Sequence, residues 1–222
     1  ASGCAINCRY CFRRHFPYSE NRLGRSQWQS ALQYIAQDSS ITEVILSGGD
    51  PLMLQDERLA ELVEHIAQIA HVKRLRVHSR LPVVIAERLT DQLTDILTRT
   101  RLRSTLVLHV NHPSELTPEH ARRLAVLRQA GVTLLNQTVL LKGVNDNAKV
   151  LVELSEQLFE HHLLPYYLHV LDRVQGAQHF DVSSAQAYAL YQQMLAQLPG
   201  YLVPKLVREE AGQPHKTPLH AF

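Results

Sequence analysis

Cys4-Ala5-Ile6-Asn7-Cys8-Arg9-Tyr10-Cys11 contains the only three cysteines of a 222-residue chain. Three thiolates on one short loop can hold three irons of a [4Fe–4S] cube, leaving the fourth iron open to a ligand that is not protein. A structural zinc site normally takes four protein ligands, and here His15 would have to be the fourth. The spacing favours an iron–sulfur cluster bound by Cys4, Cys8 and Cys11, with a zinc-binding module as the alternative.

The composition is that of an ordinary globular protein, with 45% hydrophobic and 20% charged residues. A formal net charge of +2 gives no sign of binding to nucleic acid or to a membrane surface. No apolar run approaches the roughly 20 residues of a membrane span. Cysteines confined to one metal-type loop argue for a reducing compartment and against a disulfide framework, so we expect a cytoplasmic protein.

Short apolar segments alternate with amphipathic ones along the chain. The patterns predict strands at 43–47, 74–79, 105–110, 132–141, 164–170 and 201–207, and helices at 26–37, 56–70, 90–99, 118–129, 147–161 and 183–197. Such alternation is typical of parallel βαβ units. With one more strand before Cys4, about six units would form a partial TIM-type (β/α)6 barrel, an α/β fold in a single domain over 1–222. Because the chain begins at Ala1, we expect that this strand and the region before it are missing here.

Chemistry in such barrels takes place at the carboxyl ends of the strands. The candidate motifs lie toward these ends, namely in residues 47–50, after Ser79, at His109, at Gln137 and at Asp172. Glycines allow a backbone to approach a ligand closely. Residues 47–50 are therefore a candidate ligand-binding turn, although an ordinary strand-to-helix turn has the same composition.

The cysteine spacing, with an aromatic residue just before the last cysteine, resembles the signature of radical S-adenosylmethionine (SAM) enzymes. That resemblance implies that the three cysteines bind a [4Fe–4S] cluster and that Tyr10 lies near the adenine of SAM. It also implies that Ser47, Gly48, Gly49 and Asp50 bind the methionine part of SAM. His109 and Gln137 match further SAM contacts of these enzymes.

Longer segments resemble the lysine 2,3-aminomutase family, and the resemblance extends over essentially all 222 residues. The segments are 8–16, 46–50, 79–84, 109–113, 136–146, 165–169 and 205–219. The resemblance implies an isomerase that converts L-lysine to (R)-β-lysine by radical 1,2-amino migration and needs an electron donor. The sequence of 166–172 and the chain end soon after Lys216 favour the short bacterial branch. In that branch the product passes to a separate ligase for modification of elongation factor P.

The same resemblance assigns the remaining roles. Lys216, in the segment near 205–218, matches the catalytic lysine that binds pyridoxal 5′-phosphate (PLP). Arg13 matches the arginine that binds the substrate α-carboxylate, for which a planar guanidinium is well suited. Asp172 and Glu209 match two acids that bind the distal ammonium group. The free-lysine enzyme has aspartate where Glu209 stands, and the family's arginines for the PLP phosphate lie upstream of Ala1.

Two other functions remain open on the sequence. One is another amino-acid 2,3-aminomutase, for example one that acts on glutamate, and the other is a zinc-binding interaction module without catalysis. Acids at 172 and 209 would repel an acidic substrate side chain, which favours lysine over glutamate.

Overall fold

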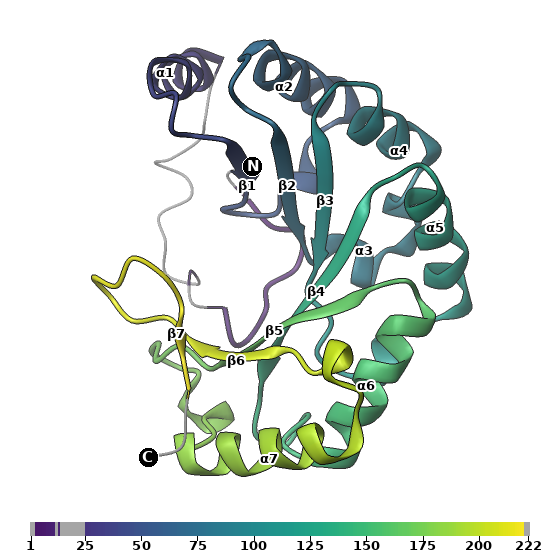
Figure 1. Ribbon diagram of the computed structural model, residues 1–222, viewed down its shortest axis with the longest axis vertical. Coiled ribbons are helices and arrows are strands. Elements are labelled where there is room, and N and C mark those ends of the chain that lie inside the picture. Colours follow the sequence, from purple (N-terminus) through teal and green to yellow (C-terminus); the bar gives the residue numbers. More distant parts are fainter. Residues whose placement is uncertain (1–2, 12, 14–24, 220–222) are drawn as a thin grey trace. The chain divides into compact units, whose positions relative to one another are not determined.

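The computed structural model describes residues 3–11, 13 and 25–219 (Figure 1). The chain divides into two compact units. The first contains residues 1–6, 16–108 and 122–134, and the second contains residues 7–15, 109–121 and 135–222. In the described ranges, no helix has the length and apolar character needed to cross a lipid bilayer.

The first unit is built on three parallel strands, β1 (Glu43–Leu46), β2 (Arg74–Ser79) and β3 (Arg103–Leu108). Helix α1 (Arg25–Gln37) precedes β1, α2 (Asp56–Gln68) connects β1 to β2, and α4 (Asp91–Thr98) precedes β3. Each connecting helix buries one apolar stripe, which comprises Leu59, Val63 and Ile66 in α2 and Leu93, Ile96 and Leu97 in α4. The burial of alternate residues in β2 follows the two-residue period of a strand with one face in a core.

Short helical turns occupy the connections of the first unit. They are η1 (Pro51–Met53), α3 (Leu81–Val84) and η2 (Ala86–Arg88). The sequence pattern did not predict α3, because four residues are too few to show a helical period.

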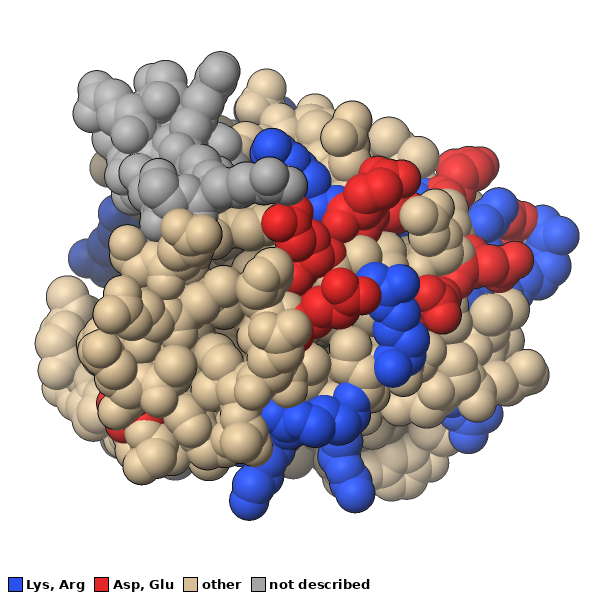
Figure 2. All heavy atoms as spheres, turned by 90° about the horizontal axis from the view of Figure 1, so that it is seen from above, with Lys and Arg blue, Asp and Glu red and all other residues tan. Residues whose placement is uncertain are grey.

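On the face in Figure 2, basic and acidic side chains are interspersed rather than separated by sign, in keeping with the small net charge.

The second unit contains most of β4 (Thr133–Leu140), together with β5 (Leu164–Val170), β6 (Lys205–Arg208) and β7 (Thr217–Pro218). Strands β4, β5 and β6 are parallel, and β7 pairs with β6 in the antiparallel sense. The helices of this unit are α6 (Ala148–Glu160) and α7 (Ser184–Gln197), with short turns η3 (Pro113–Glu115), η4 (Gln178–Phe180) and η5 (Gly200–Leu202). Helix α5 (Pro118–Gln129) has its first four residues in this unit and the rest in the first unit.

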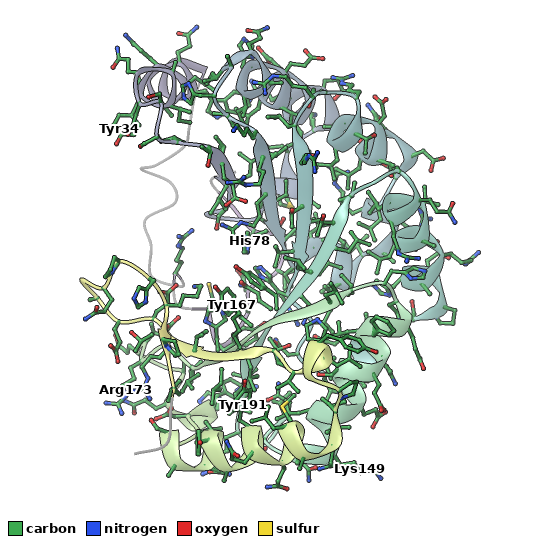
Figure 3. All side chains as sticks on the ribbon, viewed as in Figure 1. Tyr34, His78, Lys149, Tyr167, Arg173 and Tyr191 are labelled. Atoms are coloured by element: carbon green, nitrogen blue, oxygen red, sulfur yellow. The ribbon has the colours of Figure 1, made fainter. Side chains whose placement is uncertain are left out.

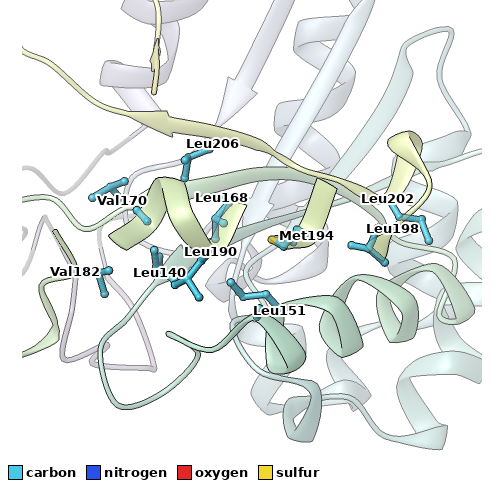
Figure 4. Close-up of a cluster of buried hydrophobic side chains, with 12 residues drawn as sticks. Leu140, Leu151, Leu168, Val170, Val182, Leu190, Met194, Leu198, Leu202 and Leu206 are labelled. Atoms are coloured by element: carbon cyan, nitrogen blue, oxygen red, sulfur yellow. The ribbon is translucent and has the colours of Figure 1, made fainter. Parts of the chain in front are cut away.

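One face of β4, β5 and β6 forms the main core of the second unit (Figure 4). The strands contribute Leu140, Leu168, Val170 and Leu206 to this core. The rest of the core consists of Ala148, Leu151, Val182, Ala187, Leu190, Met194, Leu198 and Leu202. Successive side chains of a strand point to opposite faces. The other face therefore carries Gln137, Tyr167 and His169, and the register pairs Gln137 with Tyr167. Figure 3 shows Tyr167 and the core residue Tyr191 on opposite sides of these strands.

The alternation of strands and helices confirms the predicted α/β class, and most of the predicted elements are present. The last strand differs from the prediction. Residues 200–202 form η5, and β6 begins only at Lys205. Pro204 directly precedes β6, and because proline has no N–H group it cannot donate to a strand ladder. The short strand β7 was not predicted.

Candidate active site

The predicted site residues are divided between the two units. The first unit holds Cys4 and residues 47–50, and the second holds Cys8, Tyr10, Cys11, Arg13, His109, Gln137, Asp172, Glu209 and Lys216. Ser47 is exposed at the end of β1, whereas Gly49 and Asp50 are buried. Arg13 is half-buried, and His15, the possible fourth metal ligand, lies outside the described residues.

The turn after β1 packs against the segment that carries Cys4. The backbone N–H of Asp50 donates to the Gly3 carbonyl oxygen at 3.0 Å. A Cβ atom added to Gly49 would lie 2.4 Å from that oxygen, so only glycine allows the approach. Gly48 has a φ angle of 116°, which other residues rarely adopt. The two glycines thus let the chain just before Cys4 pass directly over the end of β1.

The carboxylate of Asp50 is already saturated by protein donors. One oxygen accepts hydrogen bonds from the Ser79 hydroxyl at 2.6 Å and from the Leu52 N–H at 3.0 Å. The other accepts from the N–H groups of Arg80 at 2.8 Å and Leu81 at 2.9 Å. Asp50 therefore ties the loop after β1 to the loop after β2. A ligand at residues 47–50 would meet their backbone groups rather than this carboxylate.

Cys8 and Cys11 lie in one turn, in which the Cys11 N–H donates to the Cys8 carbonyl oxygen at 3.1 Å. Cys4 is exposed, the other two are half-buried, and none of the three forms a disulfide bond. Across residues 3–11, 13 and 25–219, no group of three or more His, Cys, Asp or Glu side chains is arranged to hold a metal ion. The donor chemistry of three cysteines still fits a cube with one open iron better than a closed zinc site.

Tyr10 anchors this turn to the second unit. Its ring packs against a small buried cluster of Leu141, Leu171 and Ala177. Its hydroxyl oxygen accepts a hydrogen bond from Asn111 Nδ2 at 2.6 Å. Arg9 adds a second attachment, because its guanidinium lies 5.3 Å from the centre of the Phe180 ring. The cysteine turn is therefore held by the loops that follow β3 and β5.

Three buried asparagines, which sequence reasoning missed, organise the segment around His109. Asn136 exchanges two hydrogen bonds with the backbone of Val110, at 2.8 and 3.0 Å. Asn145 donates to the Asn111 carbonyl oxygen at 2.8 Å. Asn136 could have been found from the sequence, because it is an amide within an apolar strand and a buried polar group needs a hydrogen-bond partner. These bonds hold the residues next to His109, and Gln137 lies on the half-buried face of β4.

The β6–β7 hairpin brings Lys216 against Glu209. The pairing of Arg208 with Thr217 places residues 209 and 216 opposite one another. Lys216 Nζ forms an ion pair with a Glu209 carboxylate oxygen. The same Nζ lies 5.5 Å from the centre of the Tyr167 ring, within cation–π range. Two residues that are predicted to hold PLP and substrate thus contact each other directly.

Asp172 lies two residues beyond β5 and is half-buried. It lines a cavity of about 270 Å³, together with Leu171, Arg173, Val174, Ala177, Gln178 and Asp181. Burial raises the pKa of the Asp172 carboxyl group, the charge of Glu209 raises it further, and Lys216 opposes the change. No hydrogen bond or ion pair joins this carboxylate to another described residue.

His169 belongs to the same group, although sequence reasoning gave it no role. It is 8% exposed, and its Nε2 atom is buried without a hydrogen-bond partner among the described residues. Burial lowers the pKa of His169 to about 4, and the positive charge of Lys216 contributes, against an opposing effect of Glu209. The ring therefore stays neutral near pH 7. The sequence could have indicated this position, because residues two apart in a strand share a face and His169 follows Tyr167 by two.

Comparison with known proteins adds independent findings. Residues 1–99 match the protein family described as a 4Fe-4S single cluster domain. The L-lysine 2,3-aminomutase of Haemophilus influenzae is 55% identical over 215 residues, which cover 97% of this chain and 64% of that protein. The Escherichia coli protein of the same description is 53% identical over 217 residues, covering 98% of this chain and 64% of its own length. The chain thus spans 64% of the length of these two relatives.

Among solved structures, the fold is similar to that of a radical SAM methyltransferase from Sphaerobacter thermophilus. The TM-score is 0.58 at 18% identity, over 94% of this chain and 64% of that one. This likeness confirms the predicted α/β fold of the radical SAM type. The two sequence matches show that this chain is similar to L-lysine 2,3-aminomutases over 97–98% of its own length.

Proposed function

We propose that this chain is the core of an isomerase that converts L-lysine to (R)-β-lysine by moving the amino group from C2 to C3. The observation that carries the proposal is the grouping of Asp172, Glu209 and Lys216 at one end of β5 and β6. Family resemblance selected these three residues from separate places in the sequence. Their electrostatic contact within one unit is what a site for a PLP-bound diamino acid requires.

The proposed cofactors have suitable donors in the chain. A [4Fe–4S] cluster would be bound by Cys4, Cys8 and Cys11. SAM would be bound by the backbone of residues 47–50, and PLP by Lys216. When bound, these groups supply hydrogen-atom abstraction at C3 and a carbonyl that carries the migrating amino group. The protein binds and orients the reactants, and it excludes water from them.

The charges of the second unit support lysine as the substrate. Arg13 would bind the α-carboxylate through its guanidinium. Asp172 and Glu209 would bind the distal ammonium, and His169, being neutral, does not repel it. A glutamate substrate would bring a third carboxylate to Asp172 and Glu209, where burial and the charge of Glu209 already raise the pKa of Asp172. The site therefore favours lysine over acidic amino acids.

We also propose two partners. A separate electron donor would reduce the cluster, and a separate ligase would attach the product to elongation factor P. The resemblance of residues 166–172 to the short bacterial branch supports the second partner. The mass of elongation factor P in cells with and without the intact protein tests it, because a missing β-lysine lowers that mass.

The main test is anaerobic reconstitution of the protein with iron, sulfide, PLP, SAM and a reductant, followed by an assay for β-lysine. We expect about four irons per chain and turnover of lysine in preference to glutamate and ornithine. One zinc per chain without sulfide would support a zinc-binding module instead. A Lys216→Ala variant that retained full isomerisation of lysine would rule out the proposed role of PLP.

A further inference from the structure

The ammonium group of Lys216 has two partners that suit a cation. It forms an ion pair with Glu209 and lies over the face of the Tyr167 ring. The Lys216 side chain is only 28% exposed, so much of it is withdrawn from solvent. The hairpin pairing of β6 with β7 determines this contact, because it places residues 209 and 216 opposite one another.

A second acid of the same group remains unneutralised. Asp172 lies close enough to Glu209 and Lys216 for both to affect the pKa of its carboxyl group. It lines the 270 Å³ cavity and has no hydrogen bond or ion pair to the described part of the chain. Because His169 is neutral near pH 7, two carboxylates share one cation. Such a group binds a further cation most readily when Lys216 is removed.

We propose that Lys216, as long as no carbonyl compound is bound to its nitrogen, occupies the position of the substrate's distal ammonium group and thereby blocks it. This inference rests on the proposed function, from which it takes the roles of Asp172 and Glu209. The ligand class is a primary alkylammonium ion, and the Lys216 side chain is itself an example. Lysine would then bind productively only after Lys216 has been drawn away from Glu209.

A titration without any cofactor tests the inference. The probe is n-propylammonium chloride, which carries the atoms that a Lys216→Ala substitution removes. Calorimetry at neutral pH compares its binding to the 222-residue chain and to the Lys216→Ala variant. We expect the variant to bind the probe about five- to tenfold more tightly, the combined contribution of a partly exposed ion pair and a cation–π contact. Propionate, an anion of the same size, should bind to neither protein.

Three further variants determine where the probe binds. Adding Asp172→Asn or Glu209→Gln to the Lys216→Ala variant should abolish the gain in affinity. Lys205→Ala is the matched control, because Lys205 pairs with Tyr167 in the strand register and is exposed. It removes the same charge from the same unit, and its affinity for the probe should equal that of the wild type.

A folded Lys216→Ala variant that binds n-propylammonium no more tightly than the wild type would overturn the inference. If that variant does not melt cooperatively, Lys216→Gln replaces it, since glutamine retains an N–H donor for Glu209. Equal affinity of a folded Lys216→Gln variant and the wild type would be just as decisive. Failure here is distinguishable from failure of the proposed function, because the titration requires none of the cofactors of the isomerase assay.

Discussion

The Asp50 carboxylate accepts a 2.6 Å hydrogen bond from the Ser79 hydroxyl, and this bond joins the carboxyl ends of β1 and β2. Asp50 is 7% exposed and Ser79 is 1% exposed. Asp50 belongs to the turn that the resemblance to SAM-binding enzymes assigns to a ligand, and Ser79 ends the neighbouring strand. Their side chains instead bind each other, and this contact gives the turn after β1 a rigid base.

Replacement of Asp50 by asparagine should destabilise the first unit. An amide NH₂ would face N–H donors that now meet a carboxylate, and we expect a loss of about 3 kcal/mol in the free energy of unfolding. Urea denaturation measures it. Asp38→Asn is the control, because Asp38 accepts comparable bonds from Ser40 at an exposed turn. Equal stability of the Asp50 variant and the wild type would contradict the assigned role.

Replacement of Gly49 by alanine should displace the segment that carries Cys4. The new Cβ would lie 2.4 Å from the Gly3 carbonyl oxygen, which is backbone and cannot rotate away. We expect a large loss of reconstituted iron and of the visible absorption of the cluster. Gly200→Ala is the control, because a Cβ there has no neighbour within 4 Å. Full iron content in the Gly49→Ala variant would contradict this prediction, because it would show that Cys4 can reach the cluster without the close packing of Gly3 on Gly49.

His169 should make the second unit sensitive to acid. The ordinary pKa of 6.5 applies to the unfolded chain, and the folded value is about 4. Between these values the unfolded chain binds a proton that the folded chain does not, so stability falls as the pH falls from 6.5 to 4. The total loss is about 3 kcal/mol. His169→Phe should flatten this part of the urea-midpoint profile, and an unchanged slope would refute the assignment.

Asp172→Asn should raise stability at pH 7 and lower the affinity for lysine. The folded pKa of this carboxyl group is raised, so ionisation opposes folding once the pH exceeds the unfolded value of 3.8. Asparagine removes that cost together with the proposed ammonium ligand. Thermal melting and the KM for lysine measure the two effects. Asp181→Asn, in the lining of the same cavity, should change neither.

Glu209 and Glu210 offer a matched pair of substitutions. Glu209 binds Lys216, whereas Glu210 accepts a 3.0 Å hydrogen bond from the Thr217 hydroxyl on the exposed side of the hairpin. In the reconstituted enzyme, Glu209→Gln should raise the KM for lysine about tenfold, since a charged partner is lost. Glu210→Gln should leave the KM unchanged. Similar KM values for the two variants would show that the charge of Glu209 has no specific role in binding lysine.

Local signals in the sequence predicted most of the secondary structure. Helix α5 runs from Pro118 to Gln129 as expected, because proline suits a first helical position and Gly131 adopts the positive φ of a helix end. Strand β5 also matches its prediction at Leu164–Val170. In both segments, the residues that favour the helix or the strand lie within about a dozen positions. The predictions failed at α3 and β7, where the elements are too short to show a period.

The sequence by itself predicted the α/β class, the resemblance to lysine 2,3-aminomutases and the chemistry of the expected donors, because these follow from cysteine spacing and from the identities of Lys216, Asp172 and Glu209. Only the tertiary structure decided how these side chains are used. It saturated the Asp50 carboxylate with four hydrogen-bond donors, paired Lys216 with Glu209 and buried His169 near them. The reason is physical: hydrogen bonds and ion pairs depend on distances of a few ångströms between segments far apart in sequence, and strand register determines those distances.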